Sequence, residues 1–425
     1  MKKAKRKMAL VVVLTLALSL VGCNGNSETK DLMKNRVDAV YCWDNTVINQ
    51  DGYDASMVTA SLSDFSLRLF EENLKVWGDT DTNLLISPIS VITALGMTSY
   101  GAKGDTLAQM EEVFGVERGY LTNHNSRYMN QDSKVLKLAN SIWFTNDERL
   151  TVNDAFLGFN EEYYGASIYE TAFNEATVDS INDWVEQNTD GMIKEILDEI
   201  PADAVMYLVN ALVFEAEWES KYDETQIRSN SRFTTQSGIE QRVDMMRSEE
   251  SLYLMDENAC GFIKYYRGRD YAFVALLPNE GITVADYVKN LSGEHLQEML
   301  ANPYTDAMIN AYIPQFSYEY NVEMSELLKE MGMTDAFDGA KADFSAMAAS
   351  TRGNIYMNRV LHKTFIEVSP VGTKAGAATV VEMMDKCETF YDEIYEVRLD
   401  RPFLYMIMDC ENNMPVFIGA VNSVE

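Results

Sequence analysis

The chain is poor in the residues that build most metal and catalytic sites. Its 425 residues include only 3 His, 5 Cys and 8 Pro. The histidines, His124, His295 and His362, lie far apart, outside any HExxH motif or Cys/His ligand spacing. We therefore expect no metal site and no cofactor. The few prolines form no linker-like stretch after residue 60, which favours one large domain.

Basic side chains are also scarce. The 35 Lys and Arg stand against 66 Asp and Glu, for a net charge of −31. Such a charge repels nucleic acid phosphates, heparin-like polyanions and anionic head groups at long range. We therefore expect neither nucleic acid nor a heparin-like polyanion as a partner. Disorder is not indicated, because 47% of the residues are hydrophobic and supply ample material for a core.

The sequence motifs of common enzymes are missing as well. No Gly-x-Ser-x-Gly elbow occurs, and the small residues at 372–379 lack the order of a phosphate-binding loop. His362 lies in a strand-like run, where a hydrogen-bonded structural role outweighs that of a catalytic base, and the other two histidines lie in polar helical or loop contexts. An enzyme or a solute-binding lipoprotein is thus a remote alternative.

The N-terminus has the pattern of an export signal. Five basic residues within 2–7 precede the apolar run 8–21, which is too short to span a bilayer comfortably. The run ends in Leu-Val-Gly-Cys, which resembles the lipobox of bacterial lipoproteins. The resemblance implies cleavage before Cys23, diacylation of that cysteine and anchoring at the surface of a bacterial cell, with membrane contact only through the lipid.

Cleavage would remove five basic residues and no acidic ones, which takes the net charge from −31 to −36. Residues from 24 to about 55 are polar and weakly periodic, as in a tether. We divide the chain into a signal peptide at 1–22, a lipidated tether and lead-in at 23–55, and a folded domain at 56–425. The sequence leaves open whether one or two disulfides form among the other thiols, Cys42, Cys260, Cys387 and Cys410.

Hydrophobic periodicity changes along the folded part. Helical patterns occur at 57–76, 88–100, 178–188, 284–300 and 322–331. Strand-like runs occur at 136–144, 206–218, 271–277, 307–313, 403–408 and 416–421. Helices and strands do not alternate regularly, so the pattern predicts an α+β fold rather than a doubly wound one.

The small residues at 372–379, followed by a long mixed segment up to Tyr395, resemble the hinge and reactive-centre loop of serpins. Ordered matches cover nearly the whole mature chain, among them NLLISPIS at 83–90, LVNALVF at 208–214, IPQF at 313–316, DRPFL at 400–404 and FIG at 417–419. The resemblance implies a single domain of three β-sheets and about nine helices, with an exposed reactive-centre loop near the C-terminus.

The resemblance also implies a function. Serpins are protease inhibitors, not enzymes: a serine protease, or in some cases a cysteine protease, cleaves the loop as a substrate. The loop then inserts into the main sheet and traps the protease as a covalent acyl complex. We therefore expect a monomeric suicide inhibitor whose partner is its target protease. The alternative is a non-inhibitory serpin that is cleaved as a plain substrate.

The hinge resembles that of an inhibitory serpin. An inserting strand turns every second side chain into the core, and one parity here holds only small residues. Pro370 departs from the family, whose inhibitors usually carry Glu at this position, and proline removes a backbone donor. The hinge, which begins at a glycine free to adopt unusual backbone angles, comprises Gly372, Thr373, Lys374, Ala375, Gly376, Ala377, Ala378 and Thr379.

Two further sets of residues follow from the resemblance. The residues matching the sheet-opening cluster beneath the main sheet are Ser87, Ser90, Asn210 and His362, with Trp218 under the top of the sheet. Counting the usual loop length from Gly372 places the scissile bond between Lys386 and Cys387, within the range 383–391. Lys386 favours trypsin-like proteases, whereas Met384, Phe390 and Tyr391 leave elastase-like and chymotrypsin-like targets open.

Overall fold

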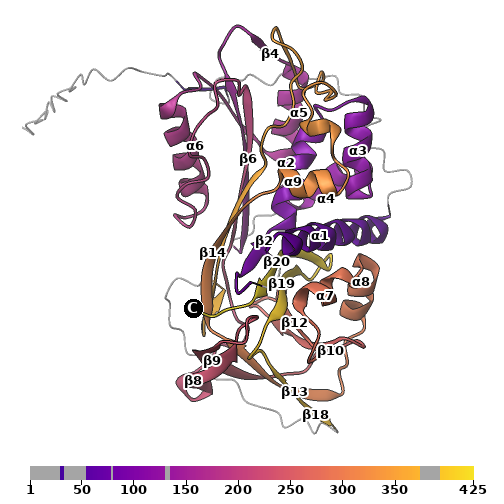
Figure 1. The fold of residues 1–425 in the computed structure, drawn as a ribbon, viewed down its shortest axis with the longest axis vertical. Coiled ribbons are helices and arrows are strands. Elements are labelled where there is room, and N and C mark those ends of the chain that lie inside the picture. Colours follow the sequence, from indigo (N-terminus) through magenta and orange to yellow (C-terminus); the bar gives the residue numbers. More distant parts are fainter. Residues whose placement is uncertain (1–28, 33–53, 78–79, 130–134, 374–392) are drawn as a thin grey trace, which may run out of the picture.

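The computed structural model describes residues 29–32, 54–77, 80–129, 135–373 and 393–425. In this part of the chain, helices pack on and around twisted sheets (Figure 1). The described α-helices are α1 (Ala55–Trp77), α2 (Pro88–Ser99), α3 (Gly104–Phe114), α4 (Arg118–Met129), α5 (Asp154–Tyr164), α6 (Glu175–Asn188), α7 (Val284–Lys289), α8 (Gly293–Ala301) and α9 (Ser325–Glu330).

The main sheet consists of two hydrogen-bonded halves. One half has the order β1-β5-β3-β6, and the other has the order β14-β16-β17-β7. The chain runs directly from β6 into β7, so both halves share this edge. The strands are β1 (Lys30–Asp31), β3 (Leu136–Thr145), β5 (Ser167–Thr171), β6 (Met206–Phe214), β7 (Ala216–Glu217), β14 (Phe316–Glu323), β16 (Leu361–Val368) and β17 (Gly372–Thr373).

The two halves meet only at one end. There the short strand β17 lies between β7 and β16, and Thr373 pairs with Ala216 on one side and with Val368 on the other. Beyond β17, no ladder pair joins β6 to β16 among the described residues. The main sheet is therefore open along most of this seam.

Two more sheets complete the architecture. The first has the order β10 (Tyr253–Met255), β11 (Ala259–Tyr265), β12 (Tyr271–Pro278), β19 (Phe403–Asp409), β20 (Met414–Val421) and β2 (Leu84–Ile86). The second has the order β18 (Glu393–Arg398), β13 (Ala307–Pro314), β9 (Glu240–Glu250) and β8 (Ile227–Thr234), and a ribbon pairs β15 (Ala348–Ser350) with β4 (Leu150–Val152). The predicted α+β fold is confirmed.

Helices α2 and α6 lie on opposite faces of β6 (Figure 1). Almost every residue of α2 is buried, because the helix also packs on β20. Its start is fixed by Ser87, whose side chain accepts a hydrogen bond from the Ser90 backbone, and by Pro88 in the first turn. On the other face, Val185 and Ile181 of α6 join Val209 of β6 in a second apolar cluster.

Several element boundaries differ from the sequence prediction. The expected helix at 284–300 is two helices, because the side chain of Ser292 caps a new helix by accepting from the His295 backbone. The expected helix at 322–331 begins only at Ser325, because β14 keeps its ladder pairs with β16 as far as Glu323. In these places tertiary pairing and capping override the hydrophobic spacing.

Candidate functional site

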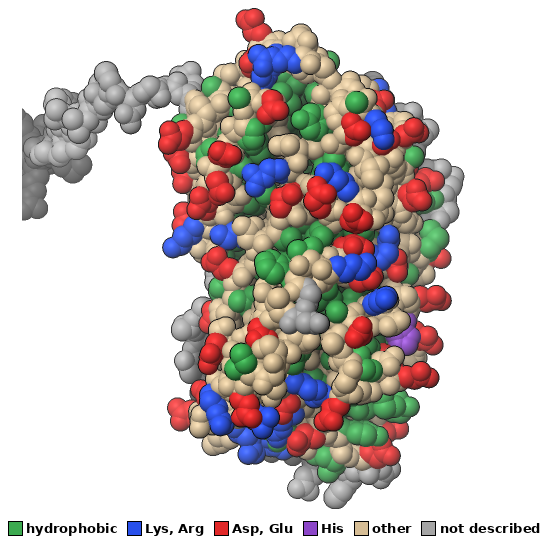
Figure 2. Space-filling view, in the orientation of Figure 1, with side chains coloured by type: hydrophobic (Ala, Val, Ile, Leu, Met, Phe, Trp, Pro, Cys, Tyr) green, Lys and Arg blue, Asp and Glu red, His purple; other side chains and the backbone are tan. Residues whose placement is uncertain are grey.

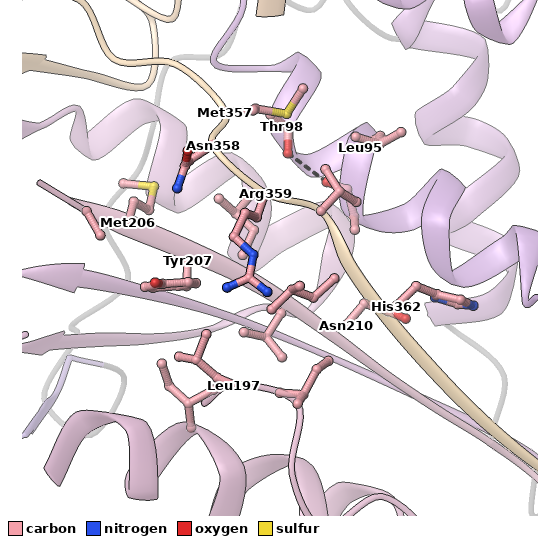
Figure 3. Close-up of a pocket in the computed structure, with 18 of the residues that line it drawn as sticks. Leu95, Thr98, Leu197, Met206, Tyr207, Asn210, Met357, Asn358, Arg359 and His362 are labelled. Carbon is pink, nitrogen blue, oxygen red and sulfur yellow. Dashed lines mark hydrogen bonds between the residues drawn. The ribbon is translucent and has the colours of Figure 1, made fainter. Parts of the chain in front are cut away.

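A cavity of about 410 Å³ occupies the open seam of the main sheet. Figure 3 shows its walls: Leu95 and Thr98 of α2, Tyr207 and Asn210 of β6, and the segment from Met357 to His362 that leads into β16. Most of the lining side chains are apolar, among them Val91, Leu197, Leu208, Leu212 and Val360. The cavity follows the line on which a strand between β6 and β16 would lie.

The structure brings Ser87, Ser90, Asn210 and His362 together at one end of this cavity. The Ser87 backbone N–H donates to His362 Nε2 at 3.0 Å, and Ser87 Oγ donates to the Val416 carbonyl at 2.9 Å. Ser90 Oγ donates to Asn210 Oδ1. Hydrogen bonds thus run from β16 through the start of α2 to β6, and so connect the two halves of the open sheet.

Asn140 on β3 extends this cluster, a role that sequence reasoning did not assign. Asn210 Nδ2 donates to Asn140 Oδ1 at 2.8 Å, and Asn140 Nδ2 donates to the Tyr164 carbonyl at 2.7 Å. The cluster therefore reaches the strand beyond β6. Its polar groups have partners, so the open seam does not leave them buried and unsatisfied.

Burial lowers the pKa of His362 to about 4, so the ring is neutral at pH 7 and Nε2 accepts a hydrogen bond. His124 is also fully buried, where its pKa is lowered to about 3. The expectation that His124 lies in a polar context is wrong, because α4 turns this residue into the core, against the ring of Tyr128. Its own neighbours in the sequence are mostly polar, so composition gave no sign of burial.

These shifts predict a loss of stability in mild acid. Because the folded pKa of His362 is depressed, its contribution is present above the unfolded value of about 6.5 and is lost as the pH falls toward 4. Urea unfolding should therefore show a falling midpoint between pH 7 and pH 4.5. The slope should decrease in His362→Gln and persist in the control His295→Gln, which alters an exposed histidine. Equal slopes in all three proteins would contradict this assignment.

The hinge begins in a tightly packed position. A Cβ on Gly372 would lie 2.0 Å from the carbonyl oxygen of Ala216, so only glycine fits against β7. Its φ is not in the left-handed region, so close approach rather than an unusual backbone angle explains this glycine. The next residue, Thr373, is 1% exposed and faces the core, where its hydroxyl hydrogen-bonds to that of Tyr266.

Trp218 lies beneath this end of the sheet and not in the polar cluster. Its ring stacks on Tyr266 with centroids 4.5 Å apart, and its indole N–H donates to the Ser369 carbonyl at 2.8 Å. The connection before the hinge is also held here, since the carbonyl of Pro370 accepts from the Tyr222 backbone at 3.0 Å. Pro370 thus helps to hold this connection through its carbonyl oxygen, although it has no backbone N–H to donate.

A buried ion pair supports the same aromatic group. Lys264 Nζ lies 2.8 Å from Glu250 Oε1 and 4.7 Å from the ring centroid of Tyr222. Burial opposes the charge on Lys264, but the nearby Tyr222 and Glu250 outweigh it and raise the lysine pKa. Sequence reasoning did not single out Lys264, Tyr222 or Tyr266, because nothing in their local pattern indicates that Tyr266 contacts Thr373 or that the other two lie nearby.

Several predicted site residues lie outside the described part of the chain. These are the rest of the hinge from Lys374 to Thr379, the proposed scissile pair Lys386 and Cys387, and Cys23 and Cys42. Cys260 and Cys410 are free thiols, and burial raises the pKa of both, that of Cys410 to about 12. Within the described ranges there is no His/Cys/Asp/Glu group suited to a metal, and no helix there is long and apolar enough to cross a membrane.

The comparison with protein families agrees with this architecture. The family model of serpins, described as serine protease inhibitors, matches residues 60–424. An uncharacterized serpin-like protein of Methanosarcina acetivorans is 29% identical, with 99% of this chain and 98% of that protein covered. Human serpin B8 is 30% identical over 84% of this chain and 97% of its own length. The chain belongs to the serpin family.

Solved structures give the same result. The thermophilic serpin tengpin in its native state is 38% identical, with a TM-score of 0.79 and coverage of 93% of this chain and 99% of that chain. Tengpin in its latent state is 41% identical, with a TM-score of 0.76 and coverage of 88% and 99%. Human thyroxine-binding globulin in complex with thyroxine, at 21% identity, shares the fold, with a TM-score of 0.75 and coverage of 87% of this chain and 99% of that chain.

Proposed function

We propose that this serpin inhibits a serine protease as a suicide substrate, by inserting its cleaved reactive-centre loop into the open seam of the main sheet. The observation that carries the proposal is the register of β17 within that seam. This strand is already paired on both sides, and it lies at the end of the seam that the cavity between β6 and β16 occupies. Insertion would extend a strand that the intact protein has already begun.

Two independent counts from β17 support this insertion. Continuing the pairing of Thr373 with Ala216 along β6 places Thr379 opposite Asn210. Continuing the pairing of Thr373 with Val368 along β16 places Thr379 opposite His362. Asn210 and His362 belong to one hydrogen-bonded cluster, so both counts lead to the same place. A threonine of the inward parity is suited to that polar position.

The chemistry of the trap belongs to the protease. Its active serine would attack the carbonyl carbon of Lys386, the bond to the nitrogen of Cys387 would break, and the new amine would take up a proton. Residues up to Lys386 would then be held as an ester of the protease serine. Insertion of residues 374–386 would carry that ester along the sheet and distort the enzyme before water can release it.

The expected result with trypsin is a covalent complex that survives SDS gel electrophoresis. Lys386 suits a specificity pocket that holds a carboxylate, so Lys386→Ala should abolish the complex with trypsin. The control Lys374→Ala removes the same charge elsewhere in the loop and should leave the complex intact. A released peptide whose N-terminus is not Cys387 would move the scissile bond, and cleavage without any complex would favour a plain substrate.

A non-inhibitory serpin is the second candidate. Pro370 favours it, because the residue stands where inhibitory serpins usually carry Glu. The hinge parity argues against it, since a loop without an inserting role has no need for small residues at every second position. The stoichiometry of inhibition separates the two functions, because a plain substrate is consumed without loss of protease activity.

The surface charge supports a protein partner rather than a polyanion. Figure 2 shows acidic side chains over the whole face and basic ones gathered most densely over β8 and β9. Even there the charges are mixed, as in the ion pair of Arg232 with Glu240 at 3.1 Å. We expect trypsin-like targets first, and no binding to nucleic acid or heparin-like polymers.

We further propose that the protein acts outside the cell as a lipid-anchored monomer. The support is the lipobox-like sequence that ends at Cys23, followed by polar residues that would form a tether. An anchored inhibitor would protect the surface of the bacterium that makes it. Fractionation should find the protein in membranes and should find Cys23→Ser released from them; membrane retention of that variant would refute the anchor.

A further inference from the structure

Arg359 is one of the charged residues that line the seam cavity. It is exposed, lies two residues before β16, and reaches toward Tyr207 on β6 (Figure 3). Among the described residues it has no ion-pair or hydrogen-bond partner for its guanidinium. Burial raises the pKa of the Tyr207 phenol and the charge of Arg359 acts against that rise, which agrees with their proximity across the seam.

The register of β17 assigns this position a partner. Counting along β16 from the pair Thr373 and Val368 places Glu382 opposite Arg359. Counting along β6 from the pair Thr373 and Ala216 places the same Glu382 opposite Tyr207. The two counts are independent, yet they agree on one loop residue between two side chains that already lie close together.

The faces of the strands agree as well. Along β16 the inward residues include His362, Thr364 and Ile366, so Arg359 has the outward parity. Thr373 faces inward, so Glu382 also has the outward parity. Directly opposite residues of an antiparallel pair share a face, and side chains of opposite charge stabilise such a pair.

We propose that Arg359 pairs with Glu382 when residues 374–386 occupy the seam, and that this pair fixes the register of insertion. The inference rests on the proposed function and names one determinant of it. Most hinge residues are small and alike, so a slip by two positions keeps the inward parity and costs little in packing. Such a slip would place Val380 or Met384 opposite Arg359, and the charge would lose its partner.

The test uses a synthetic peptide of residues 374–386, added to the intact protein. Replacing Glu382 by Gln in the peptide should raise its Kd for the wild-type protein about two- to fivefold, as expected for a cross-strand ion pair. The same replacement should have no effect on binding to Arg359→Gln. The control Arg352→Gln removes a charge that lines the same cavity but faces no residue of the inserted segment, and should behave like the wild type.

Equal effects of the peptide replacement on wild type and Arg359→Gln would overturn the inference. A charge exchange gives a second measure: in cleaved protein, Arg359→Glu and Glu382→Arg should each lower the melting temperature, and the double variant should recover it. Additive losses would also overturn the pair. Neither of these two results would mean that the wild type fails to form a covalent complex with trypsin. Only the absence of that complex in the wild type would refute the proposed function itself.

Discussion

Cleavage of the loop anywhere between Met383 and Tyr391 should raise the melting temperature by several degrees or more. Insertion would satisfy the unpaired edges of β6 and β16 and bury Val381 and Met383, which have the inward parity of Thr373. These two side chains contribute about 3–6 kcal/mol before the cost of ordering the chain. Each kcal/mol that remains raises the melting temperature by about 1–2 °C in a chain of 425 residues, because the entropy of unfolding grows with chain length.

The measurement compares intact and cleaved protein by calorimetry under one set of conditions. Chymotrypsin offers a cut after Phe390 or Tyr391, and mass spectrometry identifies the bond. A protein nicked within residues 33–53 is the matched control, because it has lost one peptide bond but retains an intact loop. Equal melting temperatures for intact and loop-cleaved protein would show that the open seam does not accept the loop.

Much of the fold could be predicted because the sequence repeats a known order of motifs. The strand runs at 136–144, 271–277 and 403–408 agree with β3, β12 and β19 within one residue at each end. Strands β12 and β19 are nearly continuous apolar runs buried at every position, for which the hydrophobic pattern is strong. Strand β3 includes the exposed Lys137 and the polar Asn140, and its second half is the mostly apolar, buried part. The polar cluster was found because family resemblance pointed to residues that lie far apart along the chain.

Features that depend on close packing could not be predicted from the sequence. The reason for glycine at 372 is the carbonyl of Ala216, which lies more than 150 positions away and is visible only in the sheet. The short strand β1 lies within the expected tether, where Lys30 and Asp31 pair with β5. A two-residue strand has no periodicity, so only the exposed edge of β5 explains why this segment pairs there.

The region around Thr373 is where the proposed insertion would begin. Its hydroxyl contacts that of Tyr266, whose ring stacks on Trp218, and Lys264 lies 5.5 Å from the Trp218 ring centroid. The pocket is thus fully buried, largely aromatic and already holds one positive charge with its partner Glu250. A small hydroxyl side chain satisfies Tyr266 there without adding volume.

Replacing Thr373 by a long cation should therefore abolish inhibition. Thr373→Arg would add a long cation beside Lys264, at a cost of several kcal/mol if the charge stayed buried and unpaired. The hinge would instead leave the seam, so the loop would be cleaved but would not insert. We expect ordinary cleavage by trypsin, no covalent complex and no rise in melting temperature after cleavage.

Two control variants should still inhibit. Thr373→Ser retains the hydroxyl, and Lys374→Arg retains a long cation at the outward parity. Inhibition by Thr373→Arg at unchanged stoichiometry would show that residue 373 need not enter the core.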